Sequence, residues 1–155
     1  MTPIISRMMK SMEWVIPDIL ARSSRPGYRS DIDAGPVGRM IVDRWIEQAK
    51  KMGIQSIICL LDDESNLEMY SNLPGRNLLA YYRRRGFSVA HIPVKDYQTP
   101  PLSREDLDNV WREFLKLPKP VMIHCSAGID RTGVAVEYIK SRLGGSDEGQ
   151  QSRTD

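Results

Sequence analysis

A cysteine and an arginine six positions apart, Cys125 and Arg131, lie in the segment HCSAGIDRTG at residues 124–133. The apolar residues 121–123 before it follow a proline-containing turn and predict a buried strand. Apolar residues at helical spacing come after it, so the segment joins a strand to the beginning of a helix. The free N–H groups of such a junction bind anions and would favour the thiolate of Cys125. Arg131 adds a planar guanidinium that can bind two phosphoryl oxygens.

This spacing of cysteine, five residues, arginine and threonine resembles the signature loop of the cysteine-dependent protein tyrosine phosphatases, in particular the small dual-specificity phosphatases. The resemblance implies that Cys125 attacks phosphorus, Arg131 binds phosphate and Thr132 helps the thiolate to leave. It also implies that His124 orients the loop. The residues that would bind the substrate phosphate are Ser126, Ala127, Gly128, Ile129, Asp130 and Arg131.

Covalent catalysis on a phosphomonoester also needs a proton for the leaving oxygen. Asp96 lies 29 residues before Cys125, in the proline-containing segment HIPVKDYQTPP at residues 91–101. This segment resembles the acid loop of small dual-specificity phosphatases, which implies that Asp96 acts first as general acid and then as general base. The alternative is an aspartate that only shapes a turn.

Asp130 departs from the commonest dual-specificity pattern, in which glycine precedes the arginine. The order Asp-Arg-Thr resembles certain bacterial tyrosine phosphatases and lipid-phosphatase branches such as the myotubularins. That resemblance implies phosphoinositides as candidate substrates. An equally open alternative is that Asp130 points away from the site and anchors the loop.

The sequence therefore predicts a phosphoric monoester hydrolase, a protein tyrosine or dual-specificity phosphatase with a cysteinyl-phosphate intermediate. An enzyme of the same chemistry acting on a phosphoinositide or an RNA 5′ phosphate is the alternative, and an inactive phosphate-binding module is the third hypothesis. We expect a phosphorylated protein or a small phosphomonoester as substrate. No metal or other cofactor is expected, because no His or Cys cluster has ligand spacing.

The composition bounds the remaining functions. The 155 residues, 41% hydrophobic and 27% charged, predict one domain that buries a core. The net charge of +2 gives no reason to expect nucleic acid as a partner. No apolar stretch reaches ~18 residues, so no membrane span is expected, and the N-terminus lacks the layout of a signal peptide. With only two cysteines, we expect a cytoplasmic protein. The oligomeric state is left open.

The expected fold is a single α/β domain, in which helices flank a central, mostly parallel sheet and the signature loop joins the last strand to a helix. Strands are expected at 14–17, 19–21, 54–61, 87–94 and 121–123, and helices at 40–52, 77–85 and 103–117, with a helix or ordered loop at 64–73. The helix at 40–52 is expected to bury the face that begins at Met40. We expect a flexible leader at 1–11, the phosphatase domain at 12–143 and a disordered polar tail at 144–155.

Two further features have alternative interpretations. In the segment RSSRPGY at 22–28, Arg22 or Arg25 assists the substrate phosphate, or the segment is a hydrogen-bonded turn, which we favour. Cys59 lies in the expected strand at 54–61. The family resemblance implies that it could pair with Cys125 as redox protection, but a buried structural thiol is the favoured interpretation.

Overall fold

The computed structural model describes residues 12–28 and 36–153. Its elements, in chain order, are β1 (Glu13–Ile16), β2 (Leu20–Ser23), α2 (Arg39–Lys51), β3 (Ser56–Cys59), α3 (Asp63–Met69), the short 3-10 helix η1 (Pro74–Arg76), α4 (Leu78–Arg84), β4 (Ser88–His91), α5 (Arg104–Lys116), β5 (Val121–His124) and α6 (Asp130–Arg153). The expected leader at 1–11 lies outside the described residues. Each expected strand and helix is present, with shorter bounds at several ends.

The five strands form one sheet in the order β1-β2-β5-β3-β4. The strands β2, β5, β3 and β4 are parallel, and β1 adds an antiparallel edge. The prediction of a mostly parallel sheet is therefore confirmed. The last residue of β5, His124, lies in register with Ser23 and Cys59, which end β2 and β3. Because parallel strands end at the same edge of a sheet, the chain segments that leave β2, β3, β4 and β5 all begin at this edge.

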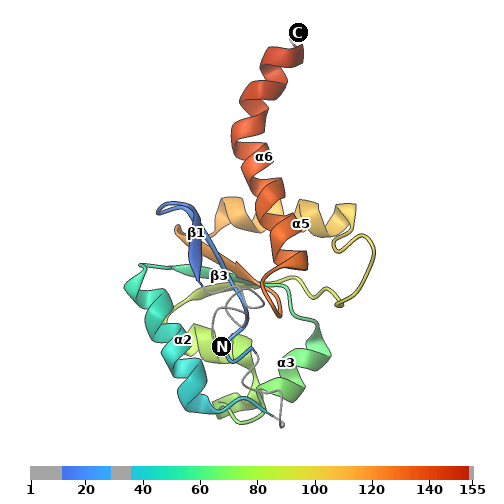
Figure 1. Cartoon of the computed structure of the whole chain (residues 1–155). Coiled ribbons are helices and arrows are strands. Elements are labelled where there is room, and N and C mark those ends of the chain that lie inside the picture. Colours follow the sequence, from blue (N-terminus) through green and yellow to red (C-terminus); the bar gives the residue numbers. More distant parts are fainter. Residues whose placement is uncertain (1–11, 29–35, 154–155) are drawn as a thin grey trace, which may run out of the picture.

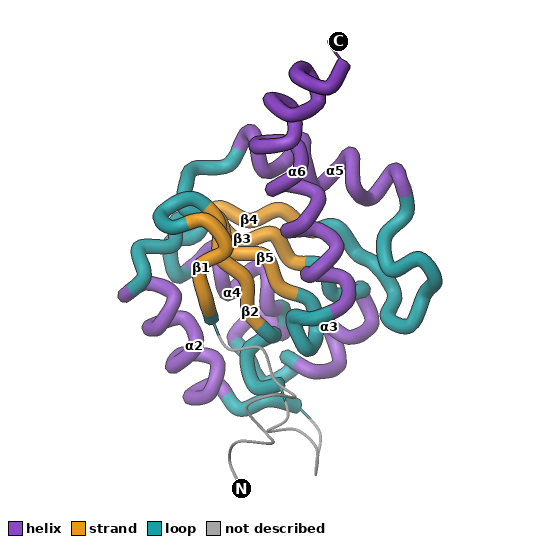
Figure 2. Tube along the Cα trace, turned by 45° about the horizontal axis from the view of Figure 1, so that its top comes forward, coloured by secondary structure: helices purple, strands orange, loops and turns teal. Residues whose placement is uncertain are grey.

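Helices cover both faces of the sheet (Figures 1 and 2). On one face, α2 and α4 pack buried side chains such as Ile46 and Tyr82 against the sheet. On the other face, α5 and α6 contribute Val110, Phe114 and Ile139. The strand β5 has buried residues along its whole length, since it lies between the two layers. The sheet edge that carries the strand ends is thus held rigidly from both sides.

Local sequence signals account for the helix ends. Ser103 and Asp106 form the expected capping box at the beginning of α5. Helix α2 ends before Gly53, which has a φ of 86°. The prediction that Met40 belongs to the buried face of α2 is wrong, since 71% of its surface is exposed. Met40 lies in the first turn of α2, and the helix buries Val42, Ile46 and Ala49 instead.

Helix α6 continues past Gly144 to Arg153, and the disordered tail at 144–155 stays a prediction. The C-terminal half of α6 projects away from the rest of the described fold (Figure 1). Two adjacent glycines weaken a helix by about 1 kcal/mol each relative to alanine, but they do not force it to end. No proline follows them. The domain limits of 12–143 stay a prediction.

Candidate active site

The signature loop leaves the central strand β5 at Cys125 and enters α6 at Asp130. Gly128 has a φ of 79°, a conformation that glycine adopts without strain. A Cβ atom at Gly128 would lie 2.4 Å from the backbone oxygen of Ser23. The amide of Arg25 also donates to the carbonyl of Ser126 over 2.8 Å. The loop is therefore packed directly against the backbone that follows β2.

Arg22 holds the loop from its outer side. Its Nη2 atom donates to the carbonyl of Gly128 over 2.7 Å, and its Nε lies 4.0 Å from a carboxylate oxygen of Glu13. The amide of Tyr28 donates to the carbonyl of Arg25 over 3.2 Å, so the segment after β2 contains the hydrogen-bonded turn that we favoured. Arg22 thus supports the loop by binding its backbone.

His124 lies behind the loop, fully buried in the core. Its Nε2 lies 2.8 Å from the hydroxyl oxygen of Tyr82, and its Nδ1 lies 3.0 Å from the carbonyl oxygen of Cys125. Burial lowers the pKa of His124 from 6.5 to about 4, although the hydrogen bond to Cys125 acts in the opposite direction. The imidazole is therefore neutral at pH 7, and it ties the loop to α4.

Arg131 is almost completely buried and makes contacts with the segment at 91–101 and with its own loop. Its Nη1 donates to the carbonyl of Val94 over 2.6 Å, next to the segment that carries Asp96. Its Nη2 lies 3.2 Å from the hydroxyl oxygen of Ser126 and 3.3 Å from a carboxylate oxygen of Asp96. The fold thus brings the expected general acid to the expected phosphate-binding arginine.

A cavity of about 390 Å³ opens at this place. Its lining contains eight residues that the sequence singled out, namely Arg25, Asp96, Cys125, Ser126, Ala127, Ile129, Asp130 and Arg131. Tyr28 and Tyr97 complete the lining. The other three candidates of the signature segment, His124, Gly128 and Thr132, do not line the cavity and are buried behind it. The hydroxyl of Thr132 has no hydrogen-bond partner among the described residues.

The sequence did not predict what four residues do in the site. Tyr28 and Tyr97 line the cavity, Arg22 binds the loop backbone, and Tyr82 contacts His124. Tyr97 directly follows Asp96, and this position in the sequence could have marked it as a contact residue. No sequence signal connects Tyr82 with His124, because 42 residues separate them.

Cys59 is a fully buried free thiol. It packs in the core beneath α2 and α4, whereas Cys125 belongs to the core on the α5 and α6 side of the sheet. Burial raises the pKa of the Cys59 thiol to about 12, so the group remains protonated at neutral pH. This environment favours the structural interpretation of Cys59.

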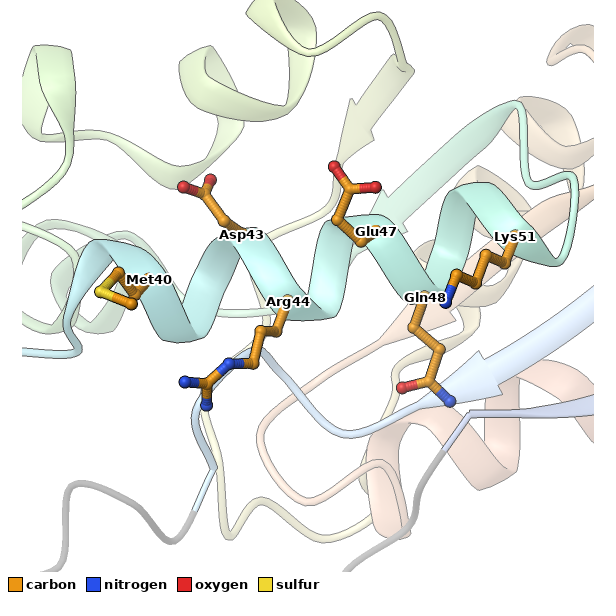
Figure 3. A pocket seen from close by; sticks show the side chains of 6 residues that line it. All are labelled: Met40, Asp43, Arg44, Glu47, Gln48 and Lys51. Carbon is orange, nitrogen blue, oxygen red and sulfur yellow. The ribbon is translucent and has the colours of Figure 1, made fainter.

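A larger hollow, of about 740 Å³, lies along α2 and contains none of the candidate residues. Figure 3 shows that Asp43 and Glu47 point to one side of the helix there, and Arg44 and Gln48 to the other. Arg85 binds the carboxylates of Asp43 and Glu47 over 2.8 and 2.9 Å. These acidic side chains thus join α2 to the end of α4.

No group of three or more His, Cys, Asp or Glu side chains within 12–28 and 36–153 is placed to hold a metal ion. In the same part of the chain, no helix has the length and apolar character needed to cross a membrane.

Comparisons with known proteins agree with this geometry. A search of curated proteins finds no match. Among the solved structures with a similar fold is the core catalytic domain of the PP-IP phosphatase SIW14 from S. cerevisiae, in complex with citrate. It is 17% identical in sequence, with a TM-score of 0.54, and the match covers 86% of this chain and 67% of that one. A family model described as "Polymorphic toxin system, DSP-PTPase phosphatase" (Tc-R-P) matches residues 39–144, more than half of the sequence. The chain therefore belongs to this family of cysteine-based phosphatases of the dual-specificity type.

Proposed function

We propose that this phosphatase acts on phosphorylated proteins through a cysteinyl-phosphate intermediate, with Asp96 as general acid. The observation that carries the proposal is the cavity in which Cys125, Arg131 and Asp96 meet. These residues come from two segments at the same edge of the sheet, and Arg131 lies 3.3 Å from Asp96. A nucleophile, an anion-binding group and a proton donor in one small cavity are the parts that phosphomonoester hydrolysis needs.

In the first step, the thiolate of Cys125 attacks phosphorus and an S–P bond forms. The bond from phosphorus to the leaving oxygen breaks, and this oxygen takes the proton of Asp96. The incoming phosphoryl group takes the place of Asp96 at Nη2 of Arg131, which frees the carboxyl group for proton transfer. The Arg131 side chain stays oriented because Nη1 remains bound to the carbonyl of Val94. The guanidinium and the loop amides stabilise the phosphoryl oxygens in the transition state.

In the second step, water attacks phosphorus, Asp96 accepts the proton and the S–P bond breaks. The free hydroxyl of Thr132 is available to donate a hydrogen bond to the departing sulfur. Neutral His124 holds the carbonyl of Cys125 and thereby the position of the nucleophile. Ser126, Ala127, Ile129 and Asp130 supply the remaining wall of the phosphate site, and Gly128 supports this wall from behind.

Tyr28 and Tyr97 support an aromatic phosphomonoester as substrate. Both side chains line the cavity that contains Cys125. An aromatic ring between them would gain about 0.5–1.5 kcal/mol per ring pair beyond the burial of its surface. We therefore favour phosphotyrosine over phosphoserine and phosphothreonine.

A phosphoinositide or an RNA 5′ phosphate is the alternative substrate. The fold resembles that of a PP-IP phosphatase, and Asp130 precedes the arginine as in lipid-phosphatase branches. Against a substrate with several phosphates, the cavity contains the carboxylates of Asp96 and Asp130. The third hypothesis is an inactive module that binds phosphate, and an assay of phosphate release tests whether the protein has any activity.

The decisive experiment measures phosphate release from a phosphotyrosine peptide, a phosphothreonine peptide and phosphoinositides, with Cys125→Ser as control. We expect the highest kcat/KM with phosphotyrosine and no turnover by Cys125→Ser, which should still bind phosphate through Arg131 and the loop amides. Turnover by Cys125→Ser near the wild-type rate would refute the covalent mechanism. A higher kcat/KM with phosphoinositides than with the peptides would instead identify phosphoinositides as the substrate class.

The Asp96→Asn variant tests the general acid separately. It should slow the hydrolysis of phosphotyrosine more than that of aryl phosphates with good leaving groups, since only the former need a proton in the transition state. An equal loss with both substrates would assign the proton transfer to another residue, with Asp130 next in line.

The proposed place of action is a reducing cytoplasm, because the thiolate of Cys125 must remain reduced to attack phosphorus. The family description names polymorphic toxin systems, and we propose this context for the chain as well. Expression of the wild-type protein inside a test cell should then slow growth, while expression of Cys125→Ser to the same level should not. Equal growth would argue against a toxic phosphatase.

A further inference from the structure

A second hollow adjoins the catalytic cavity, and we call it the α6 groove. It measures about 610 Å³ and is lined on one side by α6, including Asp130, Val134 and Glu137, and on the other by Pro101 and Leu107. Residues 130, 134 and 137 share one face of a helix, since they lie four and three positions apart. The groove therefore runs along α6, away from the signature loop.

The α6 groove shares two lining residues with the catalytic cavity. Ile129 and Asp130 line both hollows, so they form the wall between them. The Asp130 side chain is exposed, and no described residue makes a hydrogen bond or ion pair with it. Asp130 thus does not anchor the loop through any of these residues, and it lines both hollows.

The groove combines an apolar floor with carboxylates at two points. Pro101, Leu107 and Val134 supply apolar surface, and Asp130 and Glu137 supply negative charge. Two helical turns, about 10 Å, separate the Cα atoms of these acidic residues. Lysine and arginine side chains match this arrangement, because they carry a cation at the end of an apolar stem.

Positive charges near the groove do not occupy these carboxylates fully. Arg22 also lines the groove, but its guanidinium is bound to the carbonyl of Gly128 and faces Glu13. Lys140 lies 3.5 Å from Glu137, and 69% of the Glu137 side chain and 47% of the Lys140 side chain are exposed. Such exposed pairs contribute little and exchange readily for another cation.

We propose that the α6 groove binds the side chain of a lysine or arginine that neighbours the phosphorylated residue of a protein substrate. This inference rests on the proposed function, since it requires a polypeptide substrate. The basic stem lies on Pro101, Leu107 and Val134, and its cation lies near Glu137. The same carboxylates disfavour polyanionic substrates by repulsion.

The test compares phosphotyrosine peptides that carry lysine, norleucine or glutamate at each neighbouring position in turn. Norleucine keeps the apolar stem and removes the charge, so the ratio of kcat/KM between lysine and norleucine measures the electrostatic part alone. At one position or more we expect a ratio of roughly three to ten at low ionic strength, which decreases as salt is added. Glutamate should give the slowest hydrolysis at the same position. Equal kcat/KM for the three peptides at every position would overturn the proposal.

Variants of Glu137 connect the preference to the groove. Glu137→Gln should bring the lysine to norleucine ratio to within about twofold of unity, and Glu137→Lys should reverse the preference towards glutamate. Glu113→Gln is a matched control, because Glu113 forms a similar pair with Lys116 over 3.4 Å but does not line the groove. Circular dichroism verifies that each variant is folded.

The outcomes separate this proposal from the proposed function. If the enzyme hydrolyses phosphotyrosine peptides and Glu137→Gln keeps the full lysine preference, the groove assignment is wrong and the proposed function stands. If it hydrolyses none of the peptides but releases phosphate from a phosphoinositide, the protein-substrate proposal fails, and the groove assignment fails with it.

Discussion

Gly128→Ala should disrupt the signature loop without removing any group that takes part in the chemistry. The φ of 79° at Gly128 costs alanine about 1–2 kcal/mol. The new Cβ would also lie 2.4, 2.6 and 2.7 Å from backbone atoms of Ser23 and Ser24. Overpacking against atoms that cannot rotate away adds about 1–3 kcal/mol. We expect the free energy of unfolding to decrease by about 2–5 kcal/mol, a large part of the ~5–15 kcal/mol of a typical domain.

Urea unfolding measures this loss, and phosphate release from a phosphotyrosine peptide measures its effect on the site. A shift of the loop by about 1 Å should reduce kcat/KM on the order of a hundredfold. Gly133→Ala is the matched control five residues away, where the new Cβ would meet only the end of the Arg22 side chain at 3.4 Å. Because Gly133 lies inside α6, this control should be neutral or stabilise the helix by up to about 1 kcal/mol. A Gly128→Ala protein as stable and active as the wild type would refute this explanation of the loop.

Three further predictions concern the residues around the loop. Since burial lowers the pKa of His124 from 6.5 to about 4, the unfolded chain takes up this proton first, and the free energy of unfolding should decrease between pH 6.5 and 4 by about 3 kcal/mol. Urea unfolding across this range measures the loss of stability. A His124 ring that titrates near pH 6.5 in the folded protein, as followed by NMR, would contradict the lowered pKa. Iodoacetamide at pH 7 should modify Cys125 but not Cys59, whose pKa is raised to about 12. Mass spectrometry of the treated native protein identifies the modified cysteine. Alkylation of Cys59 in the folded Cys125→Ser variant would show that the fold does not protect the Cys59 thiol. Arg22→Met keeps the apolar stem but removes the bond to the Gly128 carbonyl, so it should lower the free energy of unfolding by about 1.5–3 kcal/mol, whereas an unchanged urea midpoint would mean that Arg22 does not support the loop.

Local signals account for what the sequence predicted correctly. The strand before Cys125, the helix after Arg131 and the capping box at Ser103 each depend on residues a few positions apart. Hydrophobic periodicity and capping act over this same range, so they can be recognised without knowledge of the tertiary structure. The mostly parallel sheet follows from the alternation of these strands and helices.

The prediction that failed depends on longer-range packing. Met40 fits the apolar pattern of α2, but only the position of that helix against the sheet decides that it is exposed. Periodicity identifies a helix, whereas the elements packed against the helix determine which of its residues are buried.

The sequence by itself identified the family to which this protein belongs, because Cys125, Ser126–Asp130 and Arg131 are contiguous and the signature depends on spacing within one loop. Only the tertiary structure decided how the loop is supported and what lies around it. Arg22 reaches Gly128 across 106 positions, Arg131 reaches Val94 across 37, and Tyr82 reaches His124 across 42. The parallel sheet brings these segments to one edge. Each contact depends on strand order and register, and patterns among residues close together in the chain do not specify either.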